Sequence, residues 1–152
     1  MKTLSFALGV AAIIAVAASP LAAHKDHPAA KNKEIVTSFY NTIFKDKKPE
    51  EAFARYGGDK YIQHNPRVPD GKDAVIGYFT PFFKNNPEAS WEIKRVIADG
   101  DLVVLHVHSR SNASDRGRAI VDIFRVEKGK VVEHWDVIQD IPEKSANTNT
   151  MF

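Results

Sequence analysis

The chain contains no cysteine. This absence excludes disulfides, thiol catalysis and thiolate-bound metals, so the domain must be held together by its own core. The chain also has little excess charge of either sign, because 21 Lys and Arg residues stand against 19 Asp and Glu residues and form no basic stripe. Nucleic-acid binding needs positive charge concentrated against phosphates, so we expect no nucleic-acid partner.

A membrane-spanning segment is also lacking. The one long, mostly apolar run, residues 4–18, is shorter than the roughly 20 residues that a spanning helix needs. Lys2 precedes this run, and Ser19-Pro20 followed by Leu21-Ala22-Ala23 ends it with small residues suited to cleavage. We therefore predict a secretory signal at 1–23, a periplasmic or secreted protein, and no membrane contact after cleavage.

The rest of the chain divides into a polar flexible lead-in at 24–32, one domain at 33–141 and a polar, disordered tail at 142–152. Apolar residues recur every three or four positions in 35–44 and 75–83, which predicts amphipathic helices. A short helix between them is predicted to begin at Pro49 and to stop at Gly57-Gly58. From Ser90 the apolar period changes to two, which predicts four successive antiparallel strands. The layout predicts an α+β domain in which three N-terminal helices cover one face of a curved, cone-shaped antiparallel sheet.

Side-chain alternation predicts which strand residues meet. A two-residue turn at 99–100 would place Trp91 opposite His108 and Ile93 opposite His106. These residues would share one face, an apolar pocket wall that ends in two histidines. The other members of this face would be Arg95, Ile97, Leu102 and Val104.

The register of the last hairpin is open. A two-residue turn at Lys128-Gly129 would pair Asp122 with Trp135, whereas a three-residue turn with a bulge at Gly129 would pair Asp122 with His134. We favour the bulged register because it gathers the ionisable residues on one face. That face would carry Ile120, Asp122, Phe124, Val132, His134 and Asp136.

Three segments, "YIQHNP" after two helices, the helical "GKDAVIGYF" and "DIFRVEKGKVVEHWDVIQ", resemble the SnoaL-like polyketide cyclases. These belong to the nuclear transport factor 2-like superfamily, which includes ketosteroid isomerase. The resemblance covers about residues 33–140. It implies a cone-shaped α+β barrel with a deep pocket, and a homodimer formed through the outer sheet face.

The resemblance also implies chemistry: an intramolecular aldol closure in which an aspartate moves a proton, with histidine assistance and without metal or cofactor. Carried to matching positions, the acid–base residue is Asp122 and its helper is His106. His64, which we count as a third catalytic candidate, and Asn65, a candidate for substrate binding, match positions where the superfamily places polar pocket groups. The remaining candidates for contact with a hydrophobic small molecule are His108, His134, Trp135, Trp91 and Phe79.

Two other functions stay open at this point. A non-catalytic module could use the same pocket to hold an apolar small molecule. A metal enzyme could instead use His106 and His108, which project to one side of a strand, with His64 or Asp122 completing the ligands. For Asp136 and Glu133 the sequence favours structural ion pairs with Arg125 or Arg118 over catalysis.

Overall fold

The computed structural model describes residues 28–152, so the predicted signal lies outside the described residues. The chain forms three helices: α1 at Pro28–Phe44, α2 at Pro49–Tyr56 and α3 at Lys72–Asn85. The first two precede the first strand, and α3 lies between the first and second strands. The first five residues of α1 belong to the predicted flexible lead-in, so that prediction is wrong for 28–32. No helix among the described residues is long and apolar enough to cross a membrane.

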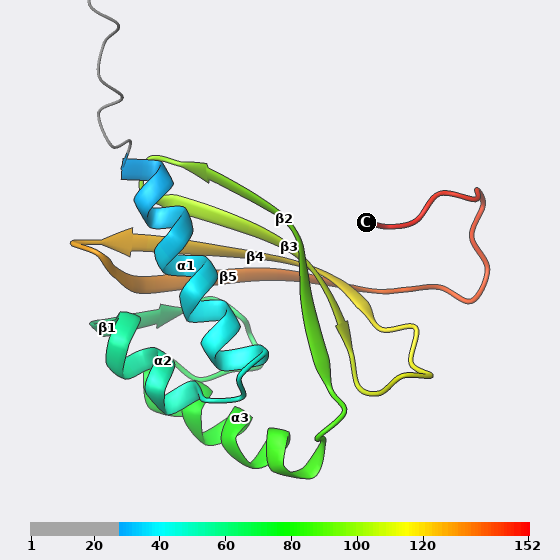
Figure 1. Cartoon of the computed structure of the whole chain (residues 1–152), viewed down its shortest axis with the longest axis horizontal. Coiled ribbons are helices and arrows are strands. Elements are labelled where there is room, and N and C mark those ends of the chain that lie inside the picture. Colours follow the sequence, from blue (N-terminus) through cyan, green and yellow to red (C-terminus); the bar gives the residue numbers. More distant parts are fainter. Residues whose placement is uncertain (1–27) are drawn as a thin grey trace, which may run out of the picture.

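The sheet has five strands: β1 at Gly57–Gln63, β2 at Ser90–Asp99, β3 at Leu102–Arg110, β4 at Arg118–Glu127 and β5 at Lys130–Asp140. Their order in space is β1-β5-β4-β3-β2. Four strands pair antiparallel as predicted, but β1 adds a fifth strand parallel to β5. The α+β prediction is confirmed, whereas the sheet is mixed and does not close into a barrel. Figure 1 shows the three helices gathered on one side of this curved sheet.

The core lies between α1 and the inner face of the sheet. Val36, Phe39, Tyr40 and Ile43 follow the predicted helical spacing and are almost fully buried. They pack over a uniformly aliphatic stretch of β3, formed by Val103, Leu105 and Val107. Because that side of β3 carries no polar group before Ser109, it faces the helices and the histidine-bearing side faces outward.

The register of the β2–β3 hairpin differs from the predicted one. Its turn is formed by Gly100 and Asp101, so Asp99 pairs with Leu102 and Arg95 with His106. A bulge between Ile93 and Arg95 then reverses the alternation of β2. Trp91 and Ile93 consequently face the core, while His106 and His108 stay on the outer face.

The last hairpin combines features of both predicted registers. The two-residue turn at Lys128-Gly129 is present, with both residues at positive φ. A bulge between Arg125 and Val126 follows, so Asp122 pairs with Asp136 and neither with His134 nor with Trp135. The preferred grouping of Asp122, His134 and Asp136 on one face is nevertheless correct. The prediction for Val132 is wrong, because Val131 takes the buried position beside Val126.

The C-terminal segment 142–152 contains no helix or strand, in agreement with its polar composition. It is not placed as a free tail, however. The ring of Phe152 stacks on His108 at 4.4 Å and lies 5.3 Å from the ring of His106. The segment therefore folds back over the outer face of β3, and Figure 1 shows the chain end beyond the β2–β3 side of the sheet.

Candidate functional site

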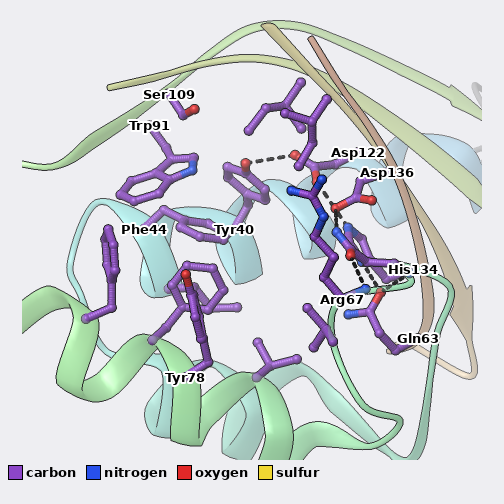
Figure 2. Close-up of a pocket in the computed structure, with 18 of the residues that line it drawn as sticks. Tyr40, Phe44, Gln63, Arg67, Tyr78, Trp91, Ser109, Asp122, His134 and Asp136 are labelled. Carbon is purple, nitrogen blue, oxygen red and sulfur yellow. Dashed lines mark hydrogen bonds and ion pairs between the residues drawn. The ribbon is translucent and has the colours of Figure 1, made fainter. Parts of the chain in front are cut away.

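A cavity of about 390 Å³ lies between the helices and the inner face of the sheet. Its walls are largely aromatic, with side chains from α1, α3 and β2. At one end the lining becomes polar where β1, β4 and β5 meet (Figure 2). The aromatic wall includes Phe44, Phe79, Phe82 and Trp91, and the polar end includes Gln63, Asp122, His134 and Asp136.

Asp122 is the centre of the polar end. Only 6% of this residue is exposed, and the tyrosine hydroxyl of Tyr40 donates a hydrogen bond of 2.8 Å to its Oδ2 atom. Its Oδ1 atom lies 3.0 Å from Nε2 of His134, which is 8% exposed. Burial, followed by the Asp122 charge, raises the pKa of Tyr40 well above its ordinary value of 10.0. Tyr40 therefore keeps its proton and acts as a permanent donor to Asp122.

The hydrogen bonds of Gln63 show which nitrogen of His134 carries a proton. The backbone N–H of Asn65 donates to Oε1 of Gln63 at 3.0 Å, which identifies that atom as the amide oxygen. The same oxygen lies 2.8 Å from Nδ1 of His134, so Nδ1 must carry a proton and donate. Since Asp122 Oδ1 and His134 Nε2 are both acceptors when deprotonated, one further proton must lie between them. Asp122 and His134 thus share a proton inside the cavity.

A second carboxylate, Asp136, lies beside this pair. Ligating atoms of Asp122, His134 and Asp136 all lie within 4.8 Å of one another. The side-chain amide of Asn65 donates to Oδ2 of Asp136 at 2.6 Å. The predicted ion pair of Asp136 with Arg125 or Arg118 is wrong, because Arg125 pairs with Glu133 and Arg118 with Asp140. The parallel pairing of β1 with β5 brings Asn65 to Asp136 instead.

Five of the residues proposed from the sequence line the cavity: Asp122, Asn65, His134, Trp91 and Phe79. Their positions agree with a pocket role, and the role itself stays a prediction. His134 lies between the rings of Tyr61 and Phe124, at centroid distances of 6.4 and 4.7 Å. This packing holds the imidazole in one orientation toward Asp122.

His106 and His108 do not line the cavity. Nη1 of Arg95 donates to Nδ1 of His106 at 3.0 Å, and Nε2 of His108 donates to the carbonyl of Arg116 at 2.8 Å. Desolvation and the Arg95 charge lower the pKa of His106. The predicted pocket wall is therefore wrong, since the bulge in β2 separates Trp91 from these histidines.

His64 and Trp135 also lie outside the cavity, on the outer face. Their rings stack at 4.7 Å with an interplanar angle of 5°. Nε2 of His64 donates to Glu133 Oε1 at 2.9 Å. The prediction of a pocket position is wrong for both, because Asp136 and His134 take the inward positions on β5 and leave Trp135 and Glu133 facing outward.

The predicted metal ligands are not brought together, because His106, His108 and His64 lie on the opposite face of the sheet from Asp122. Among the described residues, the side chains close enough to share an ion are Asp122, His134 and Asp136. In the structure these three are instead joined to Tyr40, Gln63 and Asn65 by hydrogen bonds.

Sequence reasoning missed Tyr40 and Gln63. Tyr40 occupies a core position in an amphipathic helix, and its hydroxyl gives no periodic signal that distinguishes it from Phe39. Gln63 ends a strand whose parallel pairing with β5 cannot be read from the local pattern. A polar group on the apolar face of a helix was the one available indication for Tyr40.

Comparison with known proteins gives a consistent result. The model of the SnoaL-like domain family matches residues 36–134. No curated protein matches the chain in sequence.

Similar solved structures include three bacterial proteins. One from Bacillus cereus, assigned as a polyketide cyclase, has a TM-score of 0.61 and 22% identity over 72% of this chain and 75% of its own. One from Kribbella flavida, assigned as a ketosteroid isomerase, has a TM-score of 0.63 and 14% identity over 80% and 87%. A nuclear transport factor 2-like protein of unknown function from Mesorhizobium loti has a TM-score of 0.61 and 19% identity over 76% and 97%. At these identities the likeness shows the fold alone.

Proposed function

The chain belongs to the SnoaL-like domain family, and on that premise we propose that it is an exported, cofactor-independent acid–base enzyme acting on a hydrophobic carbonyl compound. The observation that supports this most strongly is a buried carboxylate, Asp122, which shares a proton with His134 at the polar end of an apolar cavity. Buried carboxylates are uncommon without a functional reason. The aromatic walls provide apolar contact for the substrate, and the polar end provides the proton acceptor.

The proposed chemistry begins at a carbon next to the substrate carbonyl. With the shared proton on His134, Asp122 is a carboxylate and accepts the carbon-bound proton, while the electron pair of the broken C–H bond moves onto the carbonyl oxygen. The resulting enolate either attacks a second carbonyl carbon, which closes a ring, or, in a substrate with a conjugating carbon–carbon double bond, takes the proton back at the far carbon of the dienolate, which isomerises the substrate. In both cases Asp122 returns the proton and the pair is restored. Tyr40 and His134 hold the carboxylate in place throughout.

The test is an exchange experiment with 2-tetralone, an apolar ketone with exchangeable hydrogens beside its carbonyl. We expect the protein to accelerate deuterium uptake at that carbon, as measured by NMR, and Asp122→Asn to slow this uptake by roughly 10²-fold or more. Asp140→Asn is the matched control, because the same chemical change is made at an exposed carboxylate at the end of β5.

Two outcomes would contradict the proposal. Equal exchange rates in the protein and in Asp122→Asn would remove Asp122 from the mechanism. Binding of 2-tetralone without any exchange would favour the alternative of a non-catalytic binding module, for which the cavity alone suffices.

A further inference from the structure

The proposed proton transfer leaves negative charge on an oxygen, and this charge needs a donor that is free to receive it. Tyr40 already donates to Asp122, and the Nδ1 proton of His134 is directed at Gln63. Neither group can serve the substrate oxygen without giving up a hydrogen bond that positions the acid–base pair. The donor must therefore come from another part of the cavity lining.

Arg67 meets this requirement. It lies in the loop between β1 and α3 and lines the cavity. In Figure 2 its side chain extends from that loop into the cavity, with the guanidinium directed toward Asp122 and Asp136. None of the ion pairs formed within residues 28–152 involves Arg67. Its N–H groups are thus not held by a carboxylate of the described chain.

Two other arginines line the cavity, but at a different place. Arg110 and Arg118 accompany Ser109, Ser111 and Asp115. Figure 2 shows Ser109 at the opposite end from Asp122 and Asp136. Arg118 is moreover paired with Asp140, its Nε lying 3.1 Å from Oδ1. Of the three arginines that line the cavity, Arg67 is therefore the one directed toward the proton-transfer groups (Figure 2).

The backbone of Arg67 is tied to the same polar cluster. Its N–H donates to Oδ1 of Asn65 at 2.9 Å, while Nδ2 of that asparagine donates to Asp136. The N–H of Val68 donates to the carbonyl of Asn65 at 3.1 Å. Pro66 and Pro69 restrict the backbone on either side. One asparagine thus joins the backbone of Arg67 to the carboxylate of Asp136.

We propose that Arg67 binds both oxygens of a 1,3-dicarbonyl substrate as its enolate forms beside Asp122. This inference rests on the proposed function and names its substrate class and a further catalytic residue. The C–H bond between the two carbonyl carbons breaks, its proton passes to Asp122, and its electron pair spreads over the two oxygens. No oxidant, reductant or second reactant is required.

Two chemical arguments select this class. A guanidinium presents two parallel N–H donors, which match a pair of oxygens held on the same side of a planar ligand. An aspartate is also a weak base, so it removes a carbon-bound proton faster when the resulting charge is more strongly delocalised. A carbon between two carbonyl groups provides the paired oxygens and spreads the charge over both of them, whereas a ketone with a single carbonyl has one oxygen for the charge.

The experiment compares two probes with the same carbon skeleton, 1-phenylbutane-1,3-dione and 1-phenylbutan-1-one, in equilibrium binding and in absorbance titration of the bound dione. We expect the protein to bind the dione more tightly and to favour its enolate. Arg67→Gln should weaken dione binding by roughly 10- to 100-fold, the effect of losing hydrogen bonds to a charged group, and leave binding of the monoketone unchanged. Arg67→Lys keeps the charge without the paired donors. Its affinity for the dione should lie between that of the unchanged protein and that of Arg67→Gln. The control is Arg116→Gln, an arginine that does not line this cavity.

The inference is overturned if the protein does not prefer the dione, or if Arg67→Gln keeps the preference and the enolate signal. Asp122→Asn separates this inference from the proposed function. That variant should lose deuterium exchange and still bind the dione with the Arg67-dependent preference. Loss of exchange without any effect of Arg67 would leave the proposed function standing and remove this inference.

Discussion

At the scale of single residues, the position of Tyr40 determines how Asp122 can act. The hydroxyl of Tyr40 is carried by α1, 82 residues before Asp122 in the chain, and is fully enclosed by the core. Because burial and the neighbouring carboxylate raise the pKa of Tyr40 well above 10.0, it keeps its proton and donates near neutral pH. Asp122 therefore has one oxygen occupied, and its reactive geometry is constrained.

Tyr40→Phe tests this constraint. The change removes the donor to Asp122 and leaves the ring packing in place, so we expect a loss of stability of about 1–3 kcal/mol from the unsatisfied buried oxygen. We also expect slower exchange of 2-tetralone, because Asp122 is less well oriented. Denaturant unfolding measures the first effect and NMR exchange the second. Phe39→Leu provides a control that perturbs the same helix without removing a hydrogen bond, and exchange that falls equally in both variants would contradict the specific role of Tyr40.

The sequence predicted some of these residues and not others. Alternation along β5 puts His134 and Asp136 on one face, and the bulged register preferred for the last hairpin adds Asp122 to that face. Asn65 followed from the resemblance. Tyr40, Gln63 and Arg67 could not be found, since their roles depend on contacts between elements far apart in the chain.

At the scale of elements, two bulges decide which side chains enter the cavity. The bulge between Ile93 and Arg95 sends Trp91 inward and leaves His106 outside, and the bulge between Arg125 and Val126 aligns Asp122 with Asp136. A bulge adds one residue to a strand without a specific sequence signal, so strict alternation cannot locate it. This explains why the helices and the antiparallel strands were predicted, whereas the side of the sheet on which Trp91 and Ile93 lie was not.

Glu133 connects three of these elements. Its Oε1 accepts from His64 and its Oε2 accepts from Arg125 at 2.6 Å, so one carboxylate joins the end of β1 to β4 and β5. The hydrogen bond from His64, together with Arg125, lowers the pKa of Glu133 below its ordinary value of 4.5. Since the folded state holds the charged form, this stabilisation is present above about pH 4.5 and is lost as the pH falls through the lowered pKa.

We therefore predict that Glu133→Gln destabilises the protein near neutral pH and makes its stability less sensitive to acid. Thermal unfolding followed from about pH 6 down to about pH 3 should show a smaller decrease in Tm for the variant than for the unchanged protein. Glu127→Gln is the control, because Glu127 also contacts Arg125 but is 55% exposed. Parallel curves for Glu133→Gln and the unchanged protein would show that the carboxylate makes no such contribution.

At the scale of the whole molecule, the outer face of the sheet is the surface with most exposed apolar side chains. Ile97 on β2 and Val137 on β5 are 63% and 67% exposed there, and Val137 is two residues from Trp135, which stacks on His64. The C-terminal segment covers part of the same face through Phe152. Exposed apolar side chains on one sheet face favour association, and we propose that two copies pair through this face.

Val137→Glu should then convert a dimer into a monomer, because it places a charge in the centre of the proposed contact. Light scattering after size-exclusion chromatography measures the mass directly. Val137→Thr keeps the shape of the side chain and its suitability for a strand, and should leave the dimer intact. An unchanged mass for Val137→Glu, or a protein that is already monomeric, would contradict the proposed association.

The pairing of β1 with β5 has a dynamic consequence. This edge strand contacts β5 at Gly57 and again at Ile62 and Gln63, with an irregular stretch between them. Such a strand opens locally at a lower free energy than the continuous ladders of β3, β4 and β5. Each opening would detach Gln63 from His134 and free the imidazole to exchange its proton with water. Under the proposed function, exchange of protons between this pair and water would then depend on local opening of β1 at the edge of the sheet.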